Sequence, residues 1–338
     1  MFPDLLSTLL RRDDLTVEQA SQAMDVVMRG EAHPAQVAGL LIGLAMKGER
    51  PAELVGLART MRARGIAIDA GPDAIDTCGT GGDRAGTFNI STAAAIVVAG
   101  AGAQVVKHGN RSVSSHCGSA DVLEALGVKI DAPPAVVQRA VDEAGIGFCF
   151  APTFHPATRH AAEARKLLGV PTAFNLLGPL TNPGRVRFQV VGVARPELTE
   201  LIARALQQLG AARAWVVHGA DGLDELSTTG YTKVSECHGQ VVRTVSLHPS
   251  EVGLPKATPA DLRGGDATHN ASLIRAVLAG ETGPARDVVL LNAGAALFIC
   301  GHAAALKQGI ALAAAAIDDG RAARTLAALV AVTSEATA

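Results

Sequence analysis

A pair of adjacent carboxylates, Asp224 and Glu225, is the part of this sequence best suited to binding a metal ion. The pair lies in the segment HGADGLDELS at 218–227, directly after a predicted strand. Carboxylate oxygens are ligands that magnesium accepts, with phosphate and water completing its coordination shell. An Asp-Glu pair in a loop is more commonly solvated surface. The interpretation as a metal site therefore depends on what else lies at the same edge of the fold.

A glycine-rich segment could bind phosphate. The sequence DTCGTGGD at 76–83 follows a predicted strand, and NIST at 89–92 opens the next predicted helix. Glycines allow backbone N–H groups to face outward, and a helix start adds unpaired N–H groups and a positive dipole end. The alternative is a tight turn capped by Ser91 without any ligand. The glycine spacing differs from the dinucleotide-binding and P-loop patterns, which disfavours both of those folds.

A second polar segment, KHGNRSVSS at 107–115, also follows a predicted strand and is followed by GSAD at 118–121. It offers a lysine, an arginine and several hydroxyls, which suit a polyanion. A solvated loop in which Ser119 caps a helix is the less attractive alternative. Because open α/β sheets bind ligands at the carboxyl ends of their strands, we expect this loop, the glycine loop and the carboxylate pair to meet.

The elements that position these residues form two regions. Residues 1–70 are predicted to be a small helical domain, with a capping box at Thr16 and Gln19. Residues 71–338 are predicted to be an α/β domain with a central, largely parallel sheet flanked by helices. A helical stretch within about 155–185 is expected to pack on the first domain, making it discontinuous. The predicted strands are 74–77, 104–106, 147–150, 187–193, 214–218, 233–237 and 241–245. Predicted helices in the α/β domain are 91–101, 120–126, 134–144, 196–209, 273–278, 287–300 and 303–316.

Composition limits the function classes. The chain has 338 residues, 48% of them hydrophobic and 3% aromatic, with a net charge of -2. Near-neutral charge and few aromatic residues disfavour binding to nucleic acid or to an anionic membrane. The five cysteines are widely spaced, which suggests neither a disulfide framework nor a zinc site and fits a reducing cytoplasm. The charged N-terminal segment is not typical of a signal peptide, and no apolar run is long enough to span a bilayer.

The ordered motifs GTGGD, NIST, KHGNRSVSS, GSADVLEALG, FAPTFHPATRHAAEARKLLG, FNLLGPLTNP and HGADGLDELS resemble the anthranilate phosphoribosyltransferase family, which shares a fold with nucleoside phosphorylases. The resemblance covers nearly the whole chain. It implies transfer of the phosphoribosyl group of 5-phosphoribosyl 1-diphosphate to the amine of anthranilate, in tryptophan biosynthesis. It further implies two magnesium ions per site, a cytoplasmic enzyme and a homodimer formed through the helical domain.

The resemblance also implies roles for individual residues. Ser91, Asp224 and Glu225 match the magnesium ligands, and Gly79, Asn110 and Arg165 match residues that contact anthranilate. The positions that match the binding site for the sugar diphosphate are Gly79, Gly82, Asp83, Thr87, Asn89, Ile90, Ser91, Thr92, Lys107, His108, Gly109, Asn110, Arg111, Ser112, Val113, Ser114, Ser115 and Ser119. His116-Cys117 departs from the small polar pair expected there. Cys117 is either a spacer or, if a nearby cation lowers its pKa, a reactive thiol.

Three individual interpretations remain open on the residues alone. Arg165 lies on a predicted helix, where it could extend along the surface or bind a carboxylate through two hydrogen bonds. His108 and His155 are each more commonly structural than catalytic. Competing functions are a pyrimidine nucleoside phosphorylase, a phosphoribosyltransferase for another aromatic amine, and a non-catalytic nucleotide-sensing or nucleic-acid-binding relative. The carboxylate pair disfavours the phosphorylase, because that reaction does not need a metal pair.

Overall fold

The helical domain is built from short helices with well-defined starts. The computed structural model describes residues 1–112 and 117–335 of the chain. Its first four helices are α1 (Phe2–Leu10), α2 (Val17–Met28), α3 (Pro34–Lys47) and α4 (Pro51–Arg64). The capping box predicted at the start of α2 is confirmed: Gln19 N–H donates to Thr16 Oγ1 at 3.2 Å, and Thr16 N–H donates to Gln19 Oε1 at 2.9 Å. Proline at the first position of α3 and of α4 fits the helical backbone without losing a hydrogen bond.

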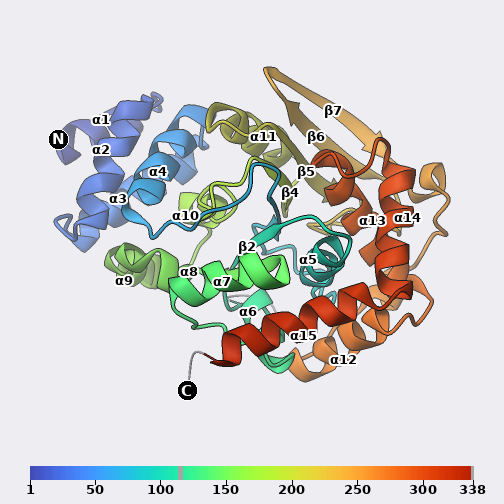
Figure 1. Cartoon of the computed structure of the whole chain (residues 1–338). Helices are drawn as coiled ribbons and strands as arrows, with labels where there is room; N and C mark the ends of the chain where they lie inside the picture. Colours follow the sequence, from blue (N-terminus) through green and yellow to red (C-terminus); the bar gives the residue numbers. More distant parts are fainter. Residues whose placement is uncertain (113–116, 336–338) are drawn as a thin grey trace.

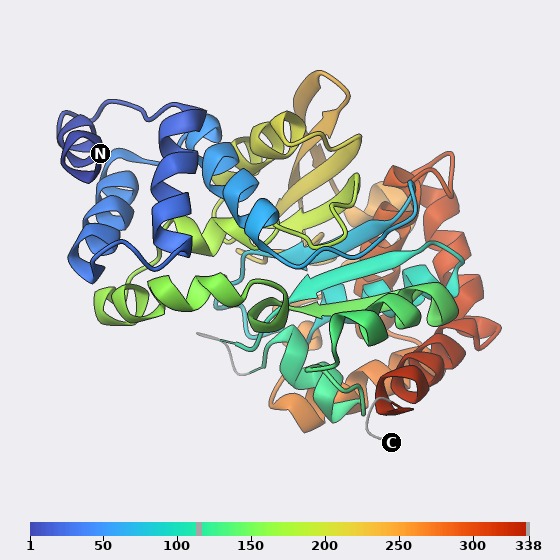
Figure 2. The ribbon, with the colours of Figure 1, turned by 60° about the vertical axis from the view of Figure 1, so that its left-hand side comes forward.

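Two later helices complete this region (Figure 1). They are α9 (Arg159–Leu168) and α10 (Ala173–Leu177), which follow the short segments α8 (Ala151–Phe154) and η1 (Pro156–Thr158). Helix α9 packs against α2 and α3, and α10 packs against α3 and α4. The segment expected to join the helical domain therefore lies against it. Figure 2 shows this green segment beside the blue helices.

A mostly parallel seven-stranded sheet forms the centre of the larger domain, as predicted. Its strands are β1 (Ile75–Gly79), β2 (Val105–Gly109), β3 (Ile146–Phe150), β4 (Phe188–Gly192), β5 (Arg213–Gly219), β6 (Thr232–His238) and β7 (Val241–Leu247). The strand order is β3-β2-β1-β4-β5-β6-β7. The first five strands are parallel, whereas β6 and β7 extend the sheet as an antiparallel hairpin.

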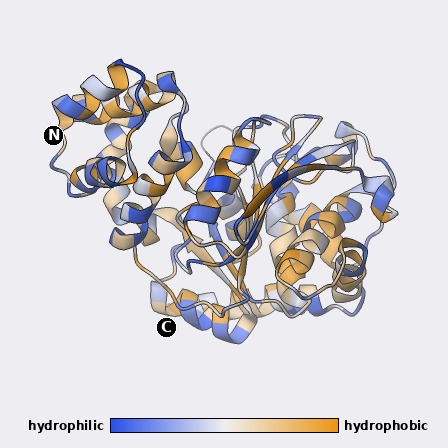
Figure 3. Ribbon diagram, turned by 90° about the horizontal axis from the view of Figure 1, so that it is seen from above, coloured by the Kyte–Doolittle hydropathy of each residue, from blue (hydrophilic) through white to orange (hydrophobic). Residues whose placement is uncertain are grey.

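Helices cover both faces of the sheet. They are α5 (Ile90–Gly100), α6 (Ser119–Ala125), α7 (Pro134–Ala144), α11 (Leu198–Gln208), α12 (Ala267–Leu278), α13 (Pro284–Ile299), α14 (Leu306–Asp318) and α15 (Arg321–Ser334), with 3-10 turns η2 (Pro249–Val252) and η3 (Pro259–Leu262). Because side chains alternate along a strand, Val190 of β4 joins the core beneath α5 and α13, while Val191 joins the core shared with α11 and the helical domain. Both faces are therefore buried, and apolar residues run along the central strands (Figure 3).

The predicted elements differ from the structure at several helices, and α15 (Arg321–Ser334) lies beyond the last predicted helix, 303–316. Helix α12 begins at Ala267, before the predicted 273, because Asp266 caps it by accepting a hydrogen bond from the His269 N–H at 2.8 Å. The short helix α8 was not predicted, and α10 was expected only as part of the helical stretch within about 155–185, since four or five residues carry no periodic signal. Within the described residues, no helix is long and apolar enough to cross a membrane.

Candidate functional site

The candidate site lies where the strand order reverses. From β1 the chain proceeds outward to β2 and β3 on one side, and β4 and β5 then extend the sheet on the other side. Gly79 at the end of β1 is paired in register with Gly192 at the end of β4. A crevice outside the carboxyl ends of strands at such a switch point is where open α/β sheets bind ligands.

The loop that carries Asp224 and Glu225 reaches this switch point from β5 by passing over the end of β4. A Cβ atom at Gly192 would lie 1.5 Å from the Asp224 carbonyl oxygen, and one at Gly79 would lie 2.7 Å from Asp224 Oδ2. Only glycine permits this approach at Gly192, because the atom it would meet belongs to the backbone. The loop therefore places the predicted metal ligands directly above β1 and β4.

The glycine loop faces the same carboxylate. Gly81 and Gly82 have φ values of +65° and +87°, which favour glycine. The Gly81 N–H donates to Asp224 Oδ2 at 3.1 Å, and the Asp224 N–H donates to Asp83 Oδ2 at 3.4 Å. The structure thus brings the loop at 79–83 together with Asp224, although the two segments are far apart in sequence.

The start of α5 meets the other carboxylate. The Ser91 N–H donates to Glu225 Oε1 at 3.0 Å, so this helix start already binds an anionic group. Ile90 is buried in the core, and its N–H donates to the Phe88 carbonyl oxygen at 2.8 Å. The hydroxyl of Thr92 is buried and finds no hydrogen-bond partner among the described residues. Thr87 forms an isolated bridge with Arg263, which fixes the far end of the glycine loop.

Three carboxylates, those of Asp83, Asp224 and Glu225, lie together without an ion pair to any described residue. Burial, followed by the charges of Asp83 and Glu225, raises the pKa of Asp224 well above its usual range. Burial raises the pKa of Glu225 to about 7, although Lys107 and Ser91 oppose the shift. Like charges held this close favour either a proton or a cation.

This donor set fits magnesium bound together with a diphosphate. Among the described residues, no group of three or more His, Cys, Asp or Glu side chains has the spacing of a site that could hold a metal by itself. Magnesium in phosphate-binding sites commonly uses only one or two carboxylates, with phosphate and water supplying the remaining oxygens. Asp224 and Glu225 meet that requirement, and Ser91 lies beside Glu225.

Lys107 and His108, adjacent on β2, point to opposite faces of the sheet. Lys107 is buried, donates to the Thr77 carbonyl oxygen, and is close enough to Glu225 to lower the pKa of that carboxyl. The His108 ring instead contacts the Gly178 carbonyl through Nδ1 at 2.9 Å. Lys107 therefore belongs to the crevice, whereas His108 can reach a ligand there only through its backbone.

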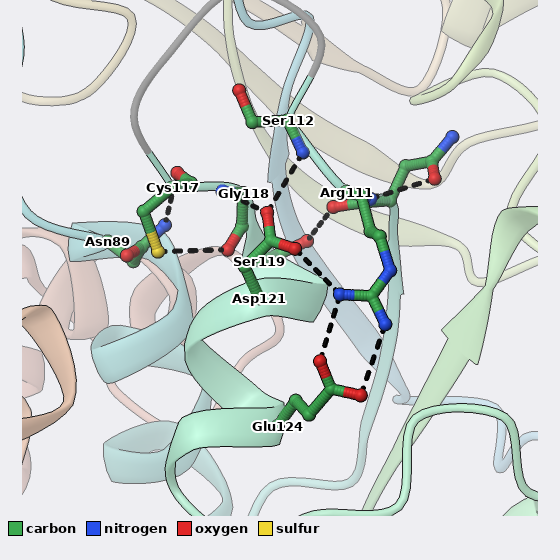
Figure 4. Close-up of polar contacts among 9 residues, drawn as sticks. Asn89, Arg111, Ser112, Cys117, Gly118, Ser119, Asp121 and Glu124 are labelled. Carbon is green, nitrogen blue, oxygen red and sulfur yellow. Dashed lines mark hydrogen bonds and ion pairs between the residues drawn. The ribbon is translucent and has the colours of Figure 1, made fainter. Parts of the chain in front are cut away.

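The second polar loop is held at both ends by Asp121 (Figure 4). Asp121 Oδ2 accepts the N–H groups of Ser112 at 3.1 Å and Gly118 at 2.8 Å. Arg111 donates to Asp121 at 2.8 Å and to both oxygens of Glu124, so its guanidinium is directed toward α6. Val113, Ser114 and Ser115, predicted to contact the sugar diphosphate, lie outside the described residues.

Asn89 links the start of α5 to the second polar loop. Its Nδ2 donates to the Cys117 carbonyl oxygen at 3.1 Å, and its Oδ1 accepts from Asn270 Nδ2 of α12 at 3.0 Å. Cys117 is buried, and burial raises the pKa of its thiol to about 11. Because a thiol with a raised pKa carries little thiolate at neutral pH, the structure favours the spacer interpretation of Cys117.

The residues expected to face anthranilate come from both domains. Asn110 is exposed just beyond the end of β2, and its carbonyl accepts from Ser119 Oγ at 3.3 Å. Arg165 lies on α9, with its guanidinium carbon 4.8 Å from the centre of the Phe174 ring. Arg165 forms no ion pair with the described part of the chain, which leaves its donors available for a carboxylate. No described contact joins Arg165 to Asn110.

Sequence reasoning missed the residues that hold the site in place, among them Gly192, Asp221 and Asn292. Gly192 lies one residue before the end of a predicted strand, so its need for close backbone approach could have been suspected. Asn292 is a single polar residue within an apolar helix, where an amide normally needs a buried partner. Neither signal says which segment is contacted.

The family comparisons agree with this geometry. Residues 71–323 match the family described as "Glycosyl transferase family, a/b domain", and residues 3–65 match its "helical bundle domain". The anthranilate phosphoribosyltransferase of Moorella thermoacetica is 54% identical over 327 residues, covering 96% of each chain. The chain belongs to the anthranilate phosphoribosyltransferase family. Another family member, from Syntrophobacter fumaroxidans, is 54% identical over 99% of this chain and 100% of its own length.

Solved structures of the family superpose on both domains. The Thermus thermophilus anthranilate phosphoribosyltransferase matches with a TM-score of 0.93 at 45% identity, covering 98% of this chain and 99% of that one. The Saccharomyces cerevisiae enzyme, solved in complex with 5-phosphoribosyl 1-diphosphate and magnesium, matches with a TM-score of 0.90 at 27% identity, covering 99% and 98%. The chain therefore has the family's fold over its whole length.

Proposed function

We propose that this chain transfers the phosphoribosyl group of 5-phosphoribosyl 1-diphosphate to the amine of anthranilate and releases diphosphate. The observation that carries the proposal is the convergence of Asp224 with the Gly81 N–H and the Asp83 carboxylate at the β1/β4 switch point. This arrangement places carboxylates that form no ion pair within the described part of the chain beside a glycine loop and a helix start. It suits a metal-bound diphosphate better than free phosphate.

The reaction forms a bond between the anthranilate nitrogen and ribose C1 as the bond from C1 to the diphosphate oxygen breaks. The leaving diphosphate takes the electron pair, and the nitrogen subsequently loses a proton. Stabilising the leaving group is then the main electrostatic task. The N–H groups of Gly81 and Ser91 hold the Asp224 and Glu225 carboxylates at this site, and the buried Lys107 adds a positive charge beside them.

Magnesium, when bound, supplies positive charge that stabilises the departing diphosphate. Asp224 and Glu225 would hold it, with Ser91 and substrate oxygens completing the shell, and we assign two ions to each site. Asp224 is oriented by Gly81, and Glu225 is oriented by the Ser91 N–H. These residues therefore keep carboxylate oxygens directed into the crevice before substrate arrives.

Arg165 is assigned to the carboxylate of anthranilate. The ring of Phe174 supports its guanidinium from one face, which leaves the N–H edge for a bidentate contact. Aromatic amines are weakly basic and are unprotonated near neutral pH, so the chain needs to supply orientation more than a strong base. Alignment of reactants is worth roughly 7–11 kcal/mol in well-oriented systems.

The direct test is a fluorescence assay that follows anthranilate consumption in the presence of 5-phosphoribosyl 1-diphosphate and Mg²⁺. We expect consumption that stops when EDTA removes the metal. Parallel reactions would contain a pyrimidine nucleoside with phosphate, or another aromatic amine in place of anthranilate. Turnover confined to either of those reactions would reject the proposal in favour of the corresponding alternative.

We also propose that the chain forms a homodimer through its helical domain, in the cytoplasm. The support is a group of exposed apolar side chains on three helices of this region: Leu10 of α1 at 85% exposure, Met46 of α3 at 72% and Leu167 of α9 at 77%. No disulfide bond joins the cysteines of the described residues, which fits a reducing compartment. Analytical ultracentrifugation of the wild type and of Leu167→Glu should show a dimer that the substitution weakens. A wild-type monomer would reject the dimer.

A further inference from the structure

The loop that carries the metal carboxylates is fixed from beneath by one buried asparagine. Asn292 lies in the middle of α13 and is 2% exposed. Its Oδ1 accepts the Leu226 N–H at 3.1 Å, and its Nδ2 donates to the Leu226 carbonyl oxygen at 2.9 Å. Asn292 therefore binds both backbone groups of the residue that directly follows Glu225.

The chemistry of this contact requires an amide in one orientation. The second N–H of Asn292 donates to the Val288 carbonyl oxygen at 2.9 Å, one turn earlier in α13. If the amide were flipped, its oxygen would face two carbonyl oxygens and its NH₂ group would face the Leu226 N–H. A carboxylate would face the same two carbonyls and add a buried charge. The network thus selects asparagine and a single orientation.

The rest of the loop is anchored so that its carboxylates remain free to face the crevice. Leu223 and Leu226, on either side of the pair, are buried in the core beneath α5 and α13. The Asp221 carboxylate accepts the Leu223 N–H at 3.2 Å and the hydroxyls of Ser227 and Thr229. The backbone on both sides of Asp224 and Glu225 is therefore held by contacts that do not use the carboxylates of this pair.

We propose that Asn292 is a positioning residue for the divalent cation: by holding the Leu226 backbone, it fixes where the Asp224 and Glu225 carboxylates point. This inference rests on the proposed function, because it assumes that these carboxylates bind the metal. Groups that orient metal ligands commonly change metal affinity by about 10–100-fold when they are replaced. We expect the effect of Asn292 in that range, in the affinity for the cation and its diphosphate.

The test compares Asn292→Leu with Asn292→Ala, which removes the same contacts without adding bulk. Calorimetry would measure binding of 5-phosphoribosyl 1-diphosphate at a series of Mg²⁺ concentrations. Thr333→Val is the matched control, because Thr333 is 3% exposed and hydrogen-bonds to Lys129 and Leu329, away from the site. We expect both Asn292 variants to need about 10–100-fold more Mg²⁺ for half-maximal binding of the sugar diphosphate. The Thr333→Val control should have a lower melting temperature than the wild type but the same Mg²⁺ requirement.

A general structural role predicts a different outcome. If Asn292 only stabilises the core, its variants and Thr333→Val would both lose stability, and their Mg²⁺ dependence would be that of the wild type; this result would overturn the proposal. The wild type offers a further test that does not depend on folding of a variant. Hydrogen exchange at the Leu226 amide should be slow before any cation is added, and protection that develops only with Mg²⁺ and the sugar diphosphate would also overturn it.

An error in the proposed function would give a different result from an error in the role of Asn292. If the wild type itself neither binds the sugar diphosphate with Mg²⁺ nor consumes anthranilate, the function is wrong and the role of Asn292 falls with it. If the wild type does both and the Asn292 variants keep its Mg²⁺ dependence, only the positioning role is wrong. The two failures are therefore distinguishable in the same set of measurements.

Discussion

Replacing His108 with asparagine should make the stability of this protein less sensitive to acid. The His108 ring is buried between the sheet and the segment that follows α10, where its Nδ1 contacts the Gly178 carbonyl. The centroids of the His108 and His155 rings are 5.1 Å apart, edge-on. Burial, followed by the charge of His155, lowers the pKa of His108 to about 3. Lys107 acts in the same direction. The Nε2 atom of His108 is buried without a partner among the described residues.

The size of the effect follows from the two pKa values. Between pH 6.5 and 3 the unfolded chain binds a proton at His108 that the folded chain does not, so the free energy of unfolding falls as the pH decreases. For an unfolded pKa near 6.5, lowering the pH from 7.5 to 5 should cost about 2 kcal/mol at this residue alone. The free energy of unfolding is therefore not reduced by His108 above pH 6.5, and the reduction grows progressively below that pH.

The assay is urea unfolding, followed by the fluorescence of Trp215, for the wild type and His108→Asn at both pH values. The asparagine Nδ2 can replace Nδ1 as the donor to the Gly178 carbonyl, so the variant keeps that contact while losing the titrating ring. The wild type should lose about 2 kcal/mol more than the variant between the two pH values. Equal losses in the two proteins would refute the reasoning, because His108 would then not change its protonation on unfolding.

Two further predictions concern the site. Gly192→Ala places a Cβ 1.5 Å from the Asp224 carbonyl oxygen, so the loop must move by more than an ångström; we expect Mg²⁺-dependent turnover to fall by about 100-fold. Gly230→Ala, with nothing within 4 Å of the added carbon, should leave turnover unchanged, and equal rates in both variants would contradict the close-approach argument. Arg165→Ala should raise the KM for anthranilate by about 10–100-fold, as expected for a charged hydrogen bond, and the KM for the sugar diphosphate much less. The exposed neighbour Lys166→Ala is its control; equal increases in both KM values would indicate a folding role.

Much of the fold could be predicted because local patterns and the global architecture agree. Short apolar runs followed by glycine or polar loops correctly located all seven strands, and the capping box at Thr16 correctly located the start of α2. The strand order could not be read from these patterns, because pairing depends on contacts between segments distant in sequence. Thus β4, which the sequence placed after β3, lies beside β1 and creates the switch point.

The site could be predicted only in part for the same reason. Glycines, serines and carboxylates at strand ends predicted which segments meet at the site, and the structure brings Gly81 near Asp224 and Ser91 near Glu225. Side-chain direction was not predictable: Arg111 is directed to α6, and His108 faces Gly178. These directions depend on partners that no local pattern specifies.

The most direct test of the account is a crystal structure with 5-phosphoribosyl 1-diphosphate and Mn²⁺, in which anomalous scattering locates the metal. We predict a peak within coordination distance of the Asp224 and Glu225 carboxylates, with the diphosphate against the glycine loop and the start of α5. A metal peak elsewhere, or a diphosphate bound away from the β1/β4 switch point, would contradict the central claim.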